Sequence, residues 1–98
     1  MIIHKQVLVG EEYQILMVPR GAEFLTAAVQ RNSICVWYKC DPDNPMVPCK
    51  IAIIPTGHIP PKSALYLGTC MFMDGAVVLH VFEVLGGHSN PPPRMMVG

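Results

Sequence analysis

The sequence predicts an all-β fold, an antiparallel sandwich or small barrel of about seven strands. Three observations lead to this prediction. Short apolar runs recur along the chain with Gly, Pro and Asn turns between them, no segment keeps a helical period for more than a few residues, and an Asp-Gly pair separates two long apolar runs. The 98 residues suit one domain. We therefore expect a single β domain over residues 1–86 and a flexible Gly/Pro-rich tail over residues 87–98.

The first half of the chain reads as two strand pairs. "IIHKQVLV" and "YQILMV" flank Gly10-Glu11-Glu12, and Pro19-Arg20-Gly21 forms the next turn. "AEFLTAAVQ" and "SICVWYKC" flank Arg31-Asn32, which is a weaker hairpin signal than Asn-Gly.

The second half continues with a loop, "DPDNPMVP", because it holds three prolines in eight residues. "CKIAIIP" is a strand and "TGHIPPKSA" a long irregular connection. The tail begins with two glycines and contains three consecutive prolines, which favours polyproline II or a flexible segment.

The last two strands form a hairpin around Asp74-Gly75, a strong signal for a two-residue type I′ turn. This turn predicts that Met73 faces Ala76, and that the strand residues pair outward from there as Phe72 with Val77, Met71 with Val78, Cys70 with Leu79 and Thr69 with His80. One face then carries Leu65, Leu67, Thr69, Met71, Val78, His80 and Phe82. The other carries Tyr66, Gly68, Cys70, Phe72, Val77, Leu79 and Val81. Neither face is polar, so we expect both to be covered.

We expect one of the two hairpin faces to be covered by another chain. A domain this small can bury one hairpin face under its own second sheet, whereas the other face needs a neighbouring subunit. We expect a two-fold homodimer through that face or through an edge strand, and the sequence leaves open which face is internal.

Composition supports an interface. Hydrophobic residues make up 51% of the chain and charged residues 14%, against about 25% charged in an ordinary soluble domain. The formal net charge is zero, so the chain lacks the excess of basic residues that is typical of direct nucleic-acid binding. No run approaches the ~20 apolar residues of a membrane span, and the N-terminus lacks a signal-peptide core. We expect no membrane association, a cytoplasmic location and mostly reduced cysteines.

Distinctive motifs extend over residues 2–84. They comprise "IHK", the turn "PRGA", "ICVWYKCDPDNP", "TGHIPP", and "GT" with "HVFE" in the final hairpin. In these motifs the chain resembles a family of small uncharacterised all-β proteins encoded by tailed phages and prophages. It departs from that family in its longer tail and in Arg31-Asn32-Ser33. The resemblance implies a phage origin and an accessory role against the host, in the cytoplasm of the host cell, and it supplies no catalytic residues.

Cysteine spacing gives no metal site. Cys35, Cys40, Cys49 and Cys70 include no C-x-x-C pair, so we expect neither zinc nor another cofactor. Cys40 and Cys49 bracket the proline loop, and whether they pair stays open. Asp41 and Asp43 resemble the start of a calcium loop whose remaining ligands are missing.

No catalytic constellation is present either. His80 lies opposite Thr69 in an apolar strand, which indicates a core histidine hydrogen-bonded to a hydroxyl or a backbone carbonyl. His58 follows Gly57 in a proline-rich loop and is the better functional candidate. No serine or cysteine has a partner base, so we expect no enzyme.

The candidate binding residues are aromatic side chains together with charged residues of the two long loops. They are Trp37, Tyr38, Asp41, Asp43, His58, Lys62 and Tyr66. The low charge, the two-sided apolar hairpin and the lack of a catalytic set favour a small non-enzymatic binding protein. Together with them, the family resemblance implies a phage-encoded inhibitor of a host defence system, such as CRISPR-Cas, that acts by protein–protein occlusion. Two alternatives remain: a sponge for a nucleotide signal of host defence, and a structural or assembly accessory of the virion. The partner is a host or phage protein.

Overall fold

A computed structural model describes residues 1–86, and in this part of the chain all extended structure is antiparallel. The strands are β1 (Ile2–Val7), β2 (Tyr13–Pro19), β3 (Glu23–Gln30), β4 (Ser33–Cys40), β5 (Met46–Pro55), β6 (Ala64–Phe72) and β7 (Val77–Val84). A short 3-10 turn, η1 (Met73–Gly75), joins the last two. The predicted all-β class and strand number are confirmed. The predicted tail, residues 87–98, lies outside the described residues.

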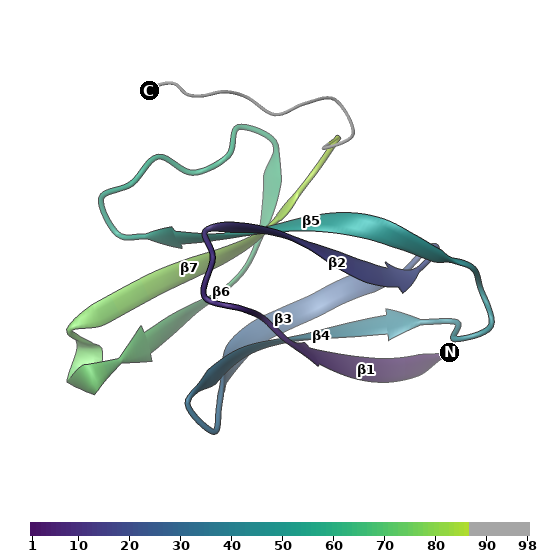
Figure 1. Ribbon diagram of the computed structural model, residues 1–98, viewed down its shortest axis with the longest axis horizontal. Helices are drawn as coiled ribbons and strands as arrows, with labels where there is room; N and C mark the ends of the chain where they lie inside the picture. The colour runs from purple at the N-terminus through teal and green to yellow at the C-terminus, as the bar shows by residue number, and fades with distance from the viewer. Residues whose placement is uncertain (87–98) are drawn as a thin grey trace.

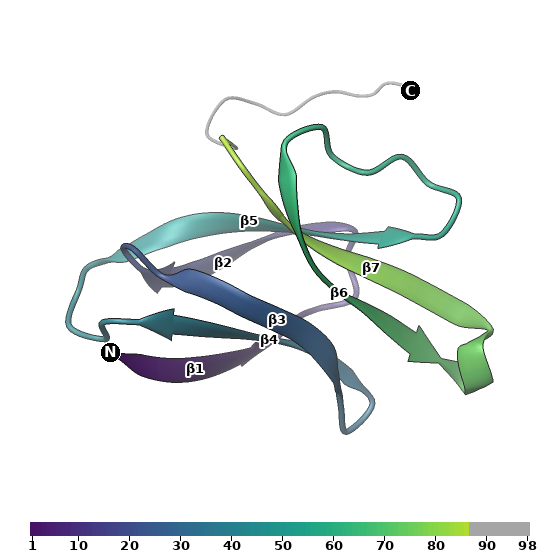
Figure 2. The ribbon, with the colours of Figure 1, turned by 180° about the vertical axis from the view of Figure 1, so that it is seen from behind.

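The strands form two sheets, with the orders β1-β4-β3 and β2-β5-β7-β6. The predicted pairing of the first two strands is wrong, because β1 pairs with β4 and β2 pairs with β5. The predicted pairing of β3 with β4 is confirmed. Figures 1 and 2 show β1, β4 and β3 together on one side of the molecule and β2 and β5 on the other, with the β6–β7 hairpin running diagonally beside them. The sheets also meet at their edges. The Thr26 hydroxyl on β3 donates to the Leu67 carbonyl on β6 at 3.3 Å, and the Gln6 amide on β1 donates to the Met17 carbonyl on β2 at 3.0 Å. The result is a sandwich whose edges approach one another as in a barrel.

The core is built from alternate residues of each strand, as strand periodicity requires. On β4, Ile34, Val36, Tyr38 and Cys40 all face inward and are buried. They pack against inward residues of the four-stranded sheet, which include Leu16, Val18, Ile51, Ile53, Cys70 and Val81. Cys40 and Cys49 are not joined by a disulfide, and all four thiols are free.

The predicted register of the hairpin is confirmed. Phe72 pairs with Val77, and Met71, Cys70 and Thr69 pair with Val78, Leu79 and His80 in turn. Asp74 and Gly75 both have positive φ, at 56° and 88°, and the Ala76 N–H donates to the Met73 carbonyl at 3.1 Å. These are the features of the predicted turn. Met73, which with Ala76 closes the turn, also has a positive φ of 54°. The strands therefore end one residue earlier than predicted, β6 at Phe72 and β7 at Val77.

A β-bulge corrects the predicted faces at the start of β6. Tyr66 pairs with Phe82 and Gly68 pairs with Val81, so Leu67 is the extra residue between them. Because a one-residue shift reverses the face of every side chain beyond it, Tyr66 lies beside Phe82 on the outer side and Leu67 packs against the core. The sequence placed both residues on the opposite faces, and likewise Leu65, which pairs with Glu83 rather than lying on the side of Phe82.

The strand that follows the acidic loop begins earlier than predicted. Residues 46–48 of the expected proline loop belong to β5 and pair with the end of β2. Proline is tolerated there because β7 pairs only with the later part of β5, from Ile51 to Pro55, so Pro48 lies where the strand has one neighbour.

Candidate functional site

The surface that stands out is the outer face of the four-stranded sheet, meaning the side turned away from the core. The strand pairings place one cross-strand row there, from Tyr13 through Ala52 and Phe82 to Tyr66. Apart from the terminal pair Pro19–Met46, whose proline is buried, the face comprises Tyr13, Ile15, Met17, Pro48, Lys50, Ala52, Ile54, Ala64, Tyr66, Thr69, Met71, Val78, His80, Phe82 and Val84. Lys50 is its one charged member among the described residues. An antiparallel sheet ordinarily presents a polar side to water, and this one does not.

The exposed apolar side chains of this face lie on its two outer strands. On β2, Tyr13, Ile15 and Met17 are 45%, 56% and 48% exposed. On β6, Tyr66 and Met71 are 59% and 60% exposed. Between them Ala52 and Ile54 on β5 are buried, and Ala52 pairs with Tyr13 on one side and Phe82 on the other. The accessible apolar surface is therefore concentrated on β2 and β6.

A chain of hydrogen bonds crosses the face. The His80 ring contacts the Thr56 hydroxyl through Nε2 at 2.8 Å and the Thr69 hydroxyl through Nδ1 at 3.1 Å. The Thr69 hydroxyl also pairs with the Tyr66 hydroxyl. The predicted bond between His80 and a hydroxyl is confirmed, but the ring is half-buried on the outer face rather than inside the core. The chain contains no carboxylate and no thiol, so its evident effect is to fix the orientation of the two rings.

The other sheet presents a more polar outer face. Lys39 and Glu23 form an ion pair at 3.1 Å, and the Lys5 ammonium donates to the Gln30 amide oxygen at 2.6 Å. Trp37 points outward between them on β4, half-buried. Tyr38 points inward and is 2% exposed, where its hydroxyl accepts a hydrogen bond from Gln6 at 2.8 Å. Burial therefore removes Tyr38 from any contact surface.

The loop candidates are not part of the strands that form the apolar face. Asp41 accepts the Asp43 N–H at 3.0 Å, an Asx turn that shapes the loop after β4. Asn44 ties that loop to the β2–β3 turn by donating to the Arg20 carbonyl at 3.0 Å. His58 and Lys62 are exposed in the β5–β6 connection, which stands out from the sandwich in Figure 1. Of the seven predicted residues, only Tyr66 belongs to the apolar face.

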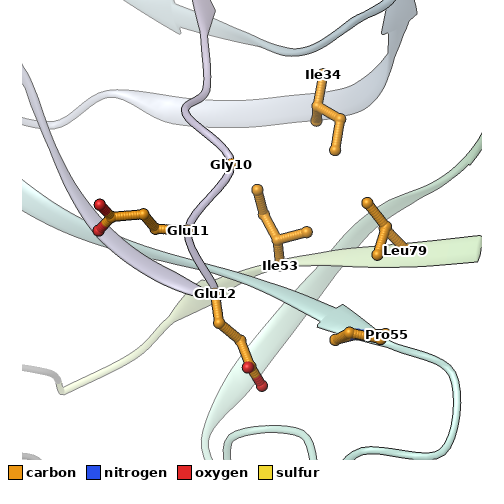
Figure 3. Close-up of a pocket in the computed structure, with 7 residues that line it drawn as sticks. All are labelled: Gly10, Glu11, Glu12, Ile34, Ile53, Pro55 and Leu79. Atoms are coloured by element: carbon orange, nitrogen blue, oxygen red, sulfur yellow. The ribbon is translucent and has the colours of Figure 1, made fainter.

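A cleft between the sheets offers a second place for a ligand. It holds about 200 Å³ and is lined by Gly10, Glu11, Glu12, Ile34, Ile53, Pro55 and Leu79. Figure 3 shows the Ile34, Ile53 and Leu79 side chains gathered together, with both glutamate side chains extending away from them. Glu12 instead lies 3.7 Å from the His58 ring, Oε2 to Nδ1. The lining residues include no cation, so this cleft has nothing with which to hold a phosphate.

The thiols show no nucleophilic activation. Burial and the neighbouring Glu83 carboxylate, 3.8 Å from Sγ, together raise the pKa of the Cys49 thiol to about 12. Burial likewise raises the pKa of Glu83. Burial also raises the pKa of Cys70. Within residues 1–86, no three His, Cys, Asp or Glu side chains gather in a way that could hold a metal ion.

The fold and its apolar sheet face define a small two-sheet β domain. The chain belongs to the family described as a domain of unknown function, DUF7352, whose model matches residues 1–90. No curated protein and no solved structure matches the chain. The part of the chain that the structure describes contains no helix long and apolar enough to cross a membrane.

Proposed function

We propose that this protein is a non-enzymatic binding protein that contacts a protein partner through the outer face of its four-stranded sheet. One observation carries the proposal: four adjacent strands present a face whose described residues include a single charge, Lys50. Large apolar patches of this kind on small domains mark protein contacts. Tyrosine and methionine, which the face exposes on β2 and β6, are enriched at such contacts.

The biological setting of the proposal rests on the resemblance of the sequence motifs to proteins of tailed phages. On that basis the chain is a phage-encoded inhibitor in the host cytoplasm, and its partner is a component of a host defence system that it occludes. An assembly role in the virion would use the same kind of surface with a phage protein as partner. Identification of the bound protein distinguishes these two settings.

A sponge for a nucleotide signal has less support. A nucleotide phosphate needs several cations gathered in one place. Arg20 and Arg31 lie in different turns, Lys50 lies on the apolar face and Lys62 lies in the β5–β6 connection. The cleft at Glu11 and Glu12 has carboxylates at its border instead.

Affinity capture with matched variants tests the proposal. Ile15→Glu adds a charge to the apolar face, and Ile3→Glu adds the same charge to an isoleucine of similar exposure on β1 in the other sheet, 56% against 64%. A tagged copy is captured from infected host cells. We expect Ile15→Glu and Met71→Glu to lose the partner that wild type and Ile3→Glu retain. Equal recovery of that partner by all four proteins would contradict the proposal.

A further inference from the structure

We infer that the partner-free protein is a homodimer in which the outer face of the four-stranded sheet of one copy packs on the same face of a second copy. This inference rests on the proposed function, because the second copy covers the same sheet face that the target is proposed to bind. The target then replaces the second copy. A two-fold dimer of this kind is isologous, so the face has to be compatible with itself.

The exposed area of the face is close to the area that a stable dimer buries on each partner. Its five most exposed side chains, Tyr13, Ile15, Met17, Tyr66 and Met71, are 45–60% exposed. A large side chain has a surface on the order of 200 Å², so these five together expose about 500 Å². The half-buried members, which include Val78, His80 and Phe82, add to this. The total approaches the roughly 800 Å² per partner that a standard stable interface buries.

The charges of the chain permit the contact. A face that meets itself places each charge against an identical set, so like charges on it oppose association. Here Lys50 is the one charge among the described residues of the face, and the formal net charge of the whole chain is zero. The opposite sheet carries Lys5, Lys39 and Glu23 on its outer side and is less suited to self-contact.

Edge-to-edge pairing through β6 is disfavoured, although the sequence left it open. The edge of β6 already lies against β3, where the Thr26 hydroxyl reaches the Leu67 carbonyl and the Gly68 Cα faces the Ala27 carbonyl. A second copy therefore finds the broad face accessible, whereas this edge is covered within the chain.

Sedimentation equilibrium of the full chain from about 1 to 200 μM tests the inference. We expect wild type and Ile3→Glu to dimerise, and Ile15→Glu and Met71→Glu to raise the dissociation constant at least about tenfold. Each variant is first checked by circular dichroism for the wild-type strand spectrum. Monomeric wild type at 200 μM, or unchanged dimerisation of both face variants, would overturn the inference.

The capture assay separates this outcome from the proposed function. A monomeric wild type whose partner is still lost in Ile15→Glu would remove the homodimer and leave the binding surface in place. A dimer disrupted by both face variants, combined with equal partner capture by all variants, would keep the homodimer and remove the proposed target surface.

Discussion

Gly68 on β6 lies directly against the backbone of Ala27 on β3, so closely that a Cβ placed on Gly68 would be 2.3 Å from the Ala27 carbonyl oxygen. This contact is where the two sheets meet at their edges. Since the opposing atom belongs to the backbone, it has little freedom to move aside. The absence of a side chain at residue 68 therefore determines how closely the sandwich closes.

Gly68→Ala is expected to destabilise the fold by about 2 kcal/mol or more, because the added methyl group forces the strands apart. Gly10→Ala is the matched control, since a Cβ at Gly10 meets nothing within 4 Å and its φ is not positive. Urea denaturation measures both free energies of unfolding. Similar losses in the two variants would show that the β3–β6 approach is looser than described.

Met73→Asn is expected to stabilise the protein by roughly 0.5 kcal/mol. Met73 has a φ of 54°, a left-handed conformation that costs most residues about 1 kcal/mol and that asparagine adopts more readily. Met46→Asn is the control, because Met46 is also an exposed methionine but lies in a strand without a positive φ. Thermal denaturation that shows a lower midpoint for Met73→Asn than for wild type would contradict this account of the turn.

Thr69→Val is expected to cost about 0.5–1.5 kcal/mol of stability, because it removes the hydroxyl that joins the His80 ring to the Tyr66 hydroxyl. Thr69→Ser keeps the hydroxyl and should retain most of the wild-type stability. Chemical denaturation of both variants checks the expectation. Equal losses in the two would show that the methyl group of Thr69, rather than its hydrogen bonds, stabilises the face.

Cys49 is expected to resist alkylation in the native protein at pH 8.5. Its pKa is raised to about 12 by burial and by the Glu83 carboxylate, so the reactive thiolate is scarce below that pH. Glu83→Gln removes the negative charge, which lowers the Cys49 pKa and shifts the rise of reaction rate to lower pH. Mass spectrometry after timed iodoacetamide treatment follows this residue. A pH–rate curve identical in wild type and Glu83→Gln would exclude the coupling.

Much of the fold follows from local patterns. The short apolar runs separated by turn residues predicted the strands, and the alternation of side chains along a strand required Trp37 and Tyr38 to face opposite sides, as they do. The Asp-Gly pair fixed the register of the last hairpin as far as Thr69 and His80. Beyond that point the prediction was wrong, because the bulge at Leu67 occurs beside the contact of Gly68 with Ala27, a residue forty-one positions away.

The candidate site was less predictable, because it too depends on contacts between residues that lie far apart in the sequence. Tyr66 was identified as a contact residue from its aromatic character, but Phe82, which pairs with it in the same row, was not. The row exists because β5 lies between β2 and β7, and that strand order depends on packing of the whole domain. The alternation in "YQILM", with Tyr13, Ile15 and Met17 on one side, was the available signal. It stays a prediction that a partner is also contacted by the remaining candidates, Trp37, Asp41, Asp43, His58 and Lys62.

The most direct measurement of the central claim is urea denaturation of Val78→Asp beside Leu79→Asp. Leu79 and Val78 are both half-buried, but Leu79 packs against the core whereas Val78 lies on the outer face opposite Met71. We predict that Leu79→Asp loses about 2 kcal/mol or more, because it places a carboxylate without a partner against apolar core residues. Val78→Asp should remain folded, with the wild-type strand spectrum by circular dichroism. Its free energy of unfolding should lie within about 1 kcal/mol of the values for the face variants Ile15→Glu and Met71→Glu. If Val78→Asp unfolds the chain as severely as Leu79→Asp, the outer face is part of the fold's own core and is not a surface for a partner.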